Sequence, residues 1–105
     1  ERWLAMRDHC ARYWRENLDR DNLAAHFGIS SSHVSRLFRQ QGGTTLMAYQ
    51  QELRIRQVCE RLRNSDEDIA SVARACGFSS VNYCIRVFTR LRGCSPARWR
   101  RQQQG

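Results

Sequence analysis

The 105-residue chain contains no lysine, a single proline and no cysteine pair in a C-x-x-C arrangement. No apolar stretch reaches the ~18 residues that a membrane-spanning helix needs, and no signal-peptide core is present. The three histidines stand at no zinc-ligand spacing from the five cysteines. These absences argue against a membrane segment, a zinc site and a disulfide framework. We expect an intracellular protein without a cofactor, whose thiols are reduced and mostly buried.

Basic charge is supplied by arginine alone and is concentrated toward the C-terminal end. The 18 arginines outnumber the 10 acidic residues and give a formal net charge of +8. Residues 70–105 hold seven arginines and no acid, whereas residues 1–21 hold five of each. Such a stretch is typical of a surface that binds nucleic acid, with a solvated basic face as the alternative. Arginine suits bidentate contacts to guanine and phosphate. A bias in genome composition would also explain why arginine is used in place of lysine.

Apolar residues recur at helical spacing along the chain, and no alternating strand pattern is present. We therefore predict an all-α fold of seven helices. The expected helices cover approximately residues 2–17, 20–27, 31–40, 45–63, 69–75, 80–92 and 96–101. The predicted N-caps are Asp19, Ser30, Thr44 or Thr45, Asp68, Ser79 or Ser80, and Ser95. The long fourth helix has apolar residues on more than one side, as expected for a helix between two packed units.

The chain contains an internal repeat with an offset of 49 to 50 residues. Asp19-x3-Leu23-Ala24-x3-Gly28 matches Asp68-x3-Val72-Ala73-x3-Gly77, and Arg36-x-Phe38-x4-Gly43 matches Arg86-x-Phe88-x4-Gly93. A small residue four positions before a glycine fits two helices that cross closely and a turn with positive φ. The repeat predicts two helix-turn-helix units, at residues 1–45 and 64–105, joined by a linker helix at 46–63.

Subtracting the inward positions leaves one outward face on the second helix of each unit, free to enter a major groove of DNA. The base-reading candidates on these faces are Ser32, Ser35, Arg36, Val81, Asn82 and Arg86. Arginine pairs with guanine and asparagine with adenine, while valine suits a thymine methyl group and serine leaves room for water or such a methyl. The two arginines could instead clamp phosphates or pair with a carboxylate of their own unit. The serines could line a solvated face.

Helix starts and further arginines supply candidates for phosphate contacts, because backbone N–H groups and guanidinium groups both bind anions. The phosphate candidates are Ser31, Arg39, Thr45, Ser80, Thr89 and Arg90, followed by Arg98 and Arg100. Each arginine of this set could equally be a solvated charge. Asn82 could be a simple helix-start residue, and Ile85 could belong to the core rather than to the outward face.

Ordered motifs in both halves resemble a known family. The segments Ile69-Ala70-Ser71-Val72-Ala73-x3-Gly77-Phe78, Tyr83-x2-Arg86-x-Phe88 and Gly93-x-Ser95-Pro96-x2-Trp99-Arg100 resemble the signature of the AraC/XylS family of bacterial transcription regulators. The first half, from Leu23-Ala24 through Arg36-x-Phe38 to Tyr49 and Arg54-Ile55, is similar to that family's first motif and linker helix. The resemblance covers nearly the whole chain.

The resemblance implies a seven-helix domain whose two recognition helices enter major grooves about one helical turn apart. It implies double-stranded promoter DNA and RNA polymerase as partners, activation of transcription, and a location in the bacterial cytoplasm. Most members carry a separate effector-binding or dimerisation domain, which we expect outside this chain, since it begins at Glu1 and not at Met. A minority are stand-alone domains. Carried over by position, the family's base contacts fall on the six base-reading candidates.

Four positions depart from the pattern of that family. Cys84 stands where an aromatic residue is usual, Ile85 where a small polar residue is common, Thr89 where Lys or Arg is common, and Gln50 where an apolar residue is usual. The departures at Ile85 and Thr89 weaken the expected DNA contacts of the second unit relative to the first. We therefore rank Arg36 above Arg86 as a base reader.

These patterns predict a non-enzymatic domain that binds double-stranded DNA sequence-specifically in transcription regulation. The alternative is a helical interaction module whose basic face meets an acidic protein or RNA. A thiol enzyme or redox sensor using Cys10 beside His9, or Cys84, is a second rival. Adjacent residues on a helix do not face each other, so His9 is badly placed to activate Cys10.

Overall fold

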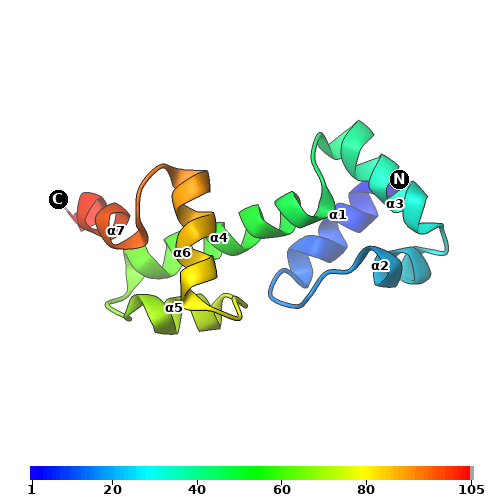
Figure 1. Cartoon of the computed structure of the whole chain (residues 1–105). Coiled ribbons are helices and arrows are strands. Elements are labelled where there is room, and N and C mark those ends of the chain that lie inside the picture. The colour runs from blue at the N-terminus through cyan, green and yellow to red at the C-terminus, as the bar shows by residue number, and fades with distance from the viewer. Residues whose placement is uncertain (105) are drawn as a thin grey trace. The chain divides into compact units, whose positions relative to one another are not determined.

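The computed structural model describes residues 1–104, which fold into seven α-helices and one π-helical turn (Figure 1). The helices are α1 (Arg2–Arg12), α2 (Arg20–Phe27), α3 (Ser31–Leu37), α4 (Leu46–Asn64), α5 (Ile69–Ala75), α6 (Val81–Arg92) and α7 (Pro96–Gln104), and the π-helical turn η1 (Phe38–Gly42) continues α3. No strand occurs within this described range, which confirms the predicted all-α fold. The chain forms two compact units, unit 1 (Glu1–Leu53) and unit 2 (Arg54–Gly105), which divide inside α4.

The helices begin where short polar side chains occupy the preceding position. The oxygens of Asp19, Ser30, Thr45, Asp68, Ser80 and Ser95 accept hydrogen bonds from the backbone N–H groups of Asp21, His33, Ala48, Ser71, Tyr83 and Arg98, at 2.7 to 3.1 Å. Each bond satisfies a donor that the first helical turn leaves without a partner. The predicted N-caps are thereby confirmed, with Thr45 and Ser80 as the capping members of their pairs.

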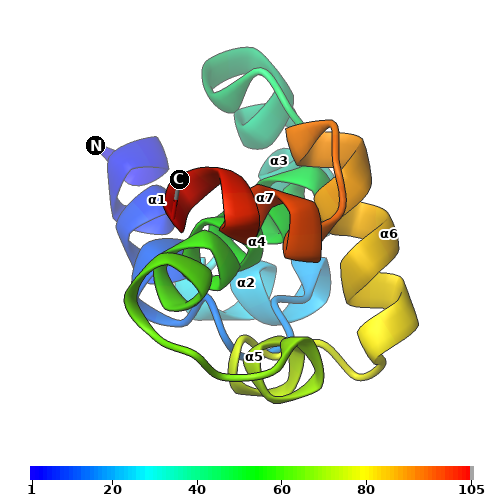
Figure 2. The same cartoon turned by 90° about the vertical axis from the view of Figure 1, so that its left-hand side faces the viewer.

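The same backbone turn joins the two helices of each helix-turn-helix unit. Gly28 has φ +67° and Gly77 has φ +87°, a region that residues with a Cβ rarely adopt. The N–H groups of Ile29 and Phe78 then donate to the carbonyls of Ala24 and Ala73, both at 3.0 Å. Figure 2 shows the result in unit 2, where α5 is seen nearly end-on and α6 from its side, so that the two helices are steeply inclined to each other. The turn predicted from the internal repeat is confirmed in both copies.

Unit 1 packs α1, α2 and α3 around one core. Its buried residues are Trp3, Met6, Cys10, Leu23, Ala24, Val34, Leu37 and Phe38, against which Leu46, Tyr49 and Leu53 of α4 pack from one side. The Trp3 ring meets Phe38 edge-on, with the ring centroids 5.0 Å apart. Each large apolar side chain contributes roughly 1.5–3 kcal/mol by leaving water, so this contiguous core holds α3 in place.

Unit 2 has a core of its own and is closed by its last helix. The buried set includes Ile55, Val58 and Leu62 of α4, Val72 and Ala73 of α5, and Cys84, Val87 and Phe88 of α6. The Arg100 guanidinium donates from Nε to the Leu62 carbonyl at 3.1 Å and from Nη2 to the Ser65 carbonyl at 3.2 Å. These bonds satisfy acceptors at the end of α4, so this predicted phosphate candidate is occupied in holding α7 to α4.

Three helix ends differ from the sequence prediction. Helix α1 ends at Arg12, five residues early, and the Gln50 side chain donates to the carbonyls of Trp14, at 3.4 Å, and Glu16 in the segment that follows. Those carbonyls therefore belong to a loop held against α4. Helix α3 passes into the π-helical turn η1 before the chain reverses, and α7 continues to Gln104. Each difference lies at a helix end, where propensity decides least.

Gly42 is required by the close approach of a tryptophan ring. A Cβ atom at this position would lie 2.7 Å from Cη2 and 2.9 Å from Cζ2 of Trp3. Trp3 cannot move freely, since its ring packs edge-on against both Phe38 and Tyr49. We expect Gly42→Ala to destabilise unit 1 by about 1–3 kcal/mol through overpacking. Thermal denaturation measures this, with the exposed neighbour Gln41→Ala as control; equal melting temperatures for the two variants would contradict the steric reason.

The five thiols differ sharply in access to solvent. Cys10, Cys59, Cys76 and Cys84 are buried, and Cys94 is half-buried. Burial raises the pKa of Cys10 to about 11, and burial together with neighbouring Cys76 raises the pKa of Cys84 to about 11. The thiolate is the reactive form, so these two cysteines are inert near neutral pH.

We expect a bulky disulfide reagent at neutral pH to modify Cys94 alone in the native protein, and all five thiols in urea. The variant Cys94→Ser should remove the native reaction. Fast modification of Cys10 or Cys84 in that variant would contradict the burial described here and would revive the thiol-enzyme alternative.

Candidate nucleic-acid interface

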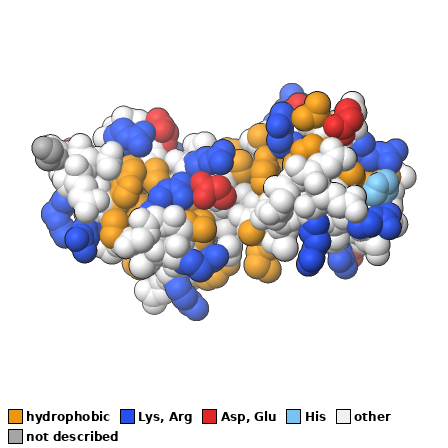
Figure 3. Space-filling view, turned by 90° about the horizontal axis from the view of Figure 1, so that it is seen from above, with side chains coloured by type: hydrophobic (Ala, Val, Ile, Leu, Met, Phe, Trp, Pro, Cys, Tyr) orange, Lys and Arg blue, Asp and Glu red, His pale blue; other side chains and the backbone are white. Residues whose placement is uncertain are grey.

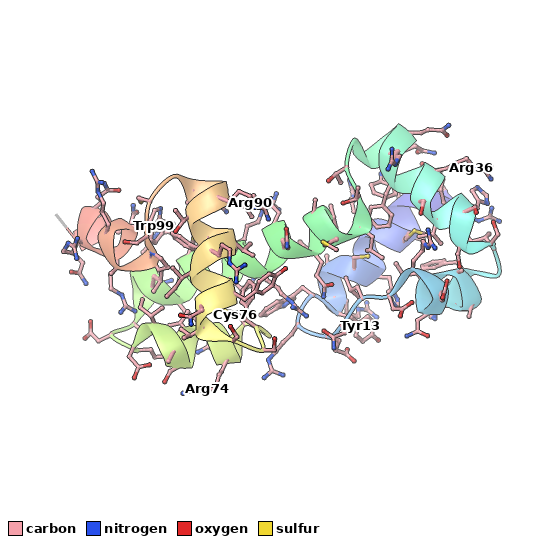
Figure 4. All side chains as sticks on the ribbon, viewed as in Figure 1. Tyr13, Arg36, Arg74, Cys76, Arg90 and Trp99 are labelled. Carbon is pink, nitrogen blue, oxygen red and sulfur yellow. The ribbon has the colours of Figure 1, made fainter. Side chains whose placement is uncertain are left out.

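In unit 1, α3 and η1 divide cleanly into a buried side and an outward side. Val34, Leu37 and Phe38 are buried, whereas Ser32, Arg36 and Arg39 are exposed, and Ser31 and Ser35 are half-buried at the edge. Arginine side chains crowd the end of unit 1 that carries α3 (Figure 3), and Arg36 lies on the outer side of α3 (Figure 4). The predicted division of this helix is confirmed, so its polar face is open to a ligand.

In unit 2, α6 shows the same division with a less polar edge. Cys84, Val87 and Phe88 are buried, whereas Asn82, Arg86, Thr89 and Arg90 are exposed. Val81 and Ile85 are half-buried at the edge of this face. The sequence left two positions open for Ile85, the core and the outward face. The structure places it between them, at the edge of the outward face.

The two leading arginines have different surroundings. Among residues 1–104, Arg36 has no carboxylate, hydrogen-bond or ring partner, which removes the alternative of an ion pair within its unit. The Arg86 guanidinium carbon lies 5.9 Å above the Tyr83 ring, and Tyr83 meets Phe78 edge-on at 6.0 Å. A cation–π contact of this kind restrains the arginine without neutralising its charge. The sequence pattern did not predict that the Tyr83 ring would contact the Arg86 guanidinium.

The four hydroxyl candidates for phosphate contacts are not equivalent. Thr45 and Ser80 only accept from the helix backbone, so their O–H groups stay available as donors. Thr89 donates its hydroxyl to the Ile85 carbonyl at 2.8 Å, and Ser31 donates to the Asp21 carboxylate. These two hydroxyls must give up an internal bond before they can donate to a phosphate.

Arg39 lies near the start of α4. It lines a shallow hollow of about 460 Å³ together with Gly43, Thr44, Thr45 and Ala48. A guanidinium group beside a capping threonine offers several N–H and O–H donors to one anion. The structure thus brings together two of the residues predicted for phosphate contacts, Arg39 and Thr45.

Helices α6 and α7 contain no acidic residue. The described residues after position 69 include no acid. Asp68 caps α5, and the Ser71 N–H and hydroxyl hold the pKa of its carboxyl below the ordinary value. The Asp68 carboxylate is therefore held at the start of α5, where it caps the helix.

A second hollow lies between α1 and α2 of unit 1. His9, Tyr13 and His26 contribute to its wall, with the rings of His9 and His26 4.5 Å apart. Burial, and then the neighbouring His26 and Arg12, lower the pKa of His9.

No group of three or more His, Cys, Asp or Glu side chains among the described residues is arranged to hold a metal ion. Within residues 1–104 no helix is both long and apolar enough to cross a membrane.

Comparison with known proteins places this geometry in context. A family model described as a helix-turn-helix domain matches residues 23–102. The transcriptional activator RhaR of Cronobacter sakazakii is 40% identical over 84 residues, which cover 80% of this chain and 30% of that protein. The arabinose operon regulatory protein of Escherichia coli is 37% identical over 93 residues, covering 89% of this chain and 31% of that protein. The chain thus spans about a third of the length of these curated relatives.

A solved structure shares the arrangement of the helices. The DNA-binding domain of the global transcriptional factor AdpA, determined in complex with a target DNA, superposes with a TM-score of 0.89. It is 27% identical in sequence, and the match covers 97% of this chain and 92% of that one. The outward faces described above are therefore carried on a scaffold that a DNA-bound protein also uses.

Proposed function

The chain belongs to the AraC/XylS family of helix-turn-helix transcription regulators, as its DNA-binding domain, and from this premise we propose that it binds double-stranded promoter DNA sequence-specifically. Each unit places its recognition helix, α3 or α6, in a major groove, and the two grooves are adjacent. The observation that carries the proposal is the exposed face of α3, where Arg36 is free of any partner among residues 1–104. A free, exposed guanidinium on such a face is suited to a guanine edge.

The proposed base readers are the six outward residues of the two recognition helices. Ser32, Ser35 and Arg36 serve unit 1, and Val81, Asn82 and Arg86 serve unit 2. The guanidinium groups suit the O6 and N7 atoms of guanine, and the Asn82 amide suits the N6 and N7 atoms of adenine. Val81 offers an apolar surface to a thymine methyl group. Support comes from their exposed or half-buried positions on one side of each helix.

Phosphate contacts flank these residues and supply affinity without sequence preference. We assign them to Arg39 and Thr45 beside the hollow at the start of α4, to Ser31, and to Ser80, Thr89 and Arg90 on α6. The free O–H groups of Thr45 and Ser80 make these two the better donors of the hydroxyl set.

The whole protein is proposed to activate transcription in the bacterial cytoplasm through contact with RNA polymerase. An effector-binding or dimerisation domain is proposed outside this chain. The support is that RhaR, a relative of greater length, is named a transcriptional activator.

Arg36 and Arg39 give a matched test on one helix face. Arg36→Ala should relax preference at one base pair and cost roughly 1–3 kcal/mol in binding, because a bidentate guanine contact is lost. Arg39→Ala should weaken all duplexes alike, because a phosphate carries no base identity. Binding is measured on the selected duplex and on its single-base variants. A uniform loss for Arg36→Ala would reassign it to phosphate.

In vitro selection from random duplex DNA tests the function as a whole. We expect two enriched blocks about 10 base pairs apart, at least one containing guanine, since the recognition helices of paired units enter grooves one turn apart. A single enriched block would show that one unit alone reads bases. No enrichment, with structured RNA competing as well as duplex DNA, would overturn the proposal and favour the interaction-module alternative.

A further inference from the structure

The first turn of α2 meets α3 through two polar contacts on the surface of unit 1. The Arg20 guanidinium donates from Nη1 to the Ser35 hydroxyl at 3.3 Å. The next residue, Asp21, accepts a hydrogen bond from the Ser31 hydroxyl. We call these four residues the α2–α3 seam. The seam places the Arg20 side chain at the edge of the face that carries Ser35 and Arg36.

The internal repeat replaces the whole seam in unit 2 by apolar residues. Arg20 and Asp21 correspond to Ile69 and Ala70, and Ser31 and Ser35 correspond to Val81 and Ile85. All four counterparts are half-buried. The two units therefore share a backbone arrangement but differ in chemistry at the same place beside the recognition helix.

Arg20 keeps its positive charge and most of its donors. A guanidinium has five N–H donors, and Ser35 is a neutral partner that uses one of them. The adjacent carboxylates are committed elsewhere, since Asp19 accepts from the backbone N–H groups of Asp21 and Asn22, and Asp21 accepts from Ser31. Among residues 1–104 no carboxylate forms an ion pair with Arg20. An exposed, oriented cation therefore stands beside α3.

We propose that Arg20 binds a DNA phosphate beside the groove that α3 occupies, and that unit 2 has no equivalent contact. The inference rests on the proposed function. In a helix-turn-helix the first helix crosses the DNA backbone while the second lies in the groove, and Arg20 is the first residue of that first helix. Ser35 holds the guanidinium toward the reading face, and the apolar Ile69 side chain offers no donor to a phosphate.

The salt dependence of binding measures the contact directly. Each neutralised phosphate adds about 0.9 to the slope of log affinity against log salt concentration. We expect Arg20→Ala to reduce the magnitude of that slope by about 0.9. The loss of DNA affinity of the variant relative to the wild type should therefore shrink ~3-fold between about 50 and about 200 mM salt. Arg20→Lys should keep the slope, because the ammonium group still neutralises the phosphate.

Arg7→Ala is the matched control, because it removes the same charge from α1, where Arg7 lies 4.0 Å from Asp8. We expect it to keep the wild-type slope. An equal fall for Arg7→Ala would overturn the inference in favour of the general field of the domain. An unchanged slope for Arg20→Ala would also overturn it. Failure of the wild type to prefer its selected duplex would instead refute the proposed function.

Discussion

The close crossing of two helices in each unit is the constraint on which the remaining structure depends. Ala24 and Ala73 are both buried at these crossings, and each carbonyl accepts a hydrogen bond from the residue after the glycine of the turn. A larger side chain at either alanine would push the second helix away from the first. The crossing buries one side of α3 and of α6, and this burial is what makes the opposite side of each helix a defined surface.

Local features of the fold were predictable because they depend on near neighbours in the chain. Each capping side chain accepts from a backbone N–H two or three residues further on. The residue type at that single position therefore indicates where the helix begins. The contacts of the loop after α1 were not predictable, since they involve Gln50, 34 to 36 residues away. The same applies to Arg100, whose charge suggested a phosphate contact but whose partners are carbonyls 35 to 38 residues earlier.

The candidate interface divides in the same way. Periodicity predicted which residues of α3 and α6 face outward, because burial follows the helical repeat. It did not predict that Tyr83 lies under Arg86, or that Arg20 reaches Ser35, since both depend on rotamers and on the crossing of helices. The comparison of the two repeats did contain a signal, because Arg20 and Ser35 change together to Ile69 and Ile85. The duplicated units have thus kept their turns and cores while their surfaces have diverged.

The bonds from Arg100 to the end of α4 bear on the order in which the nascent chain can fold. Unit 1 draws its core from residues no later than Leu53, so that core can close once this part of the chain has left the ribosome. Unit 2 must wait until Arg100 has emerged before the last carbonyls of α4 acquire their partners. At ~5–20 residues per second, synthesis of the intervening segment takes a few seconds, which is long compared with the folding of a small helical unit. Translation therefore imposes an order of folding on the two units, and the core of unit 1 can close before the chain of its duplicate is complete.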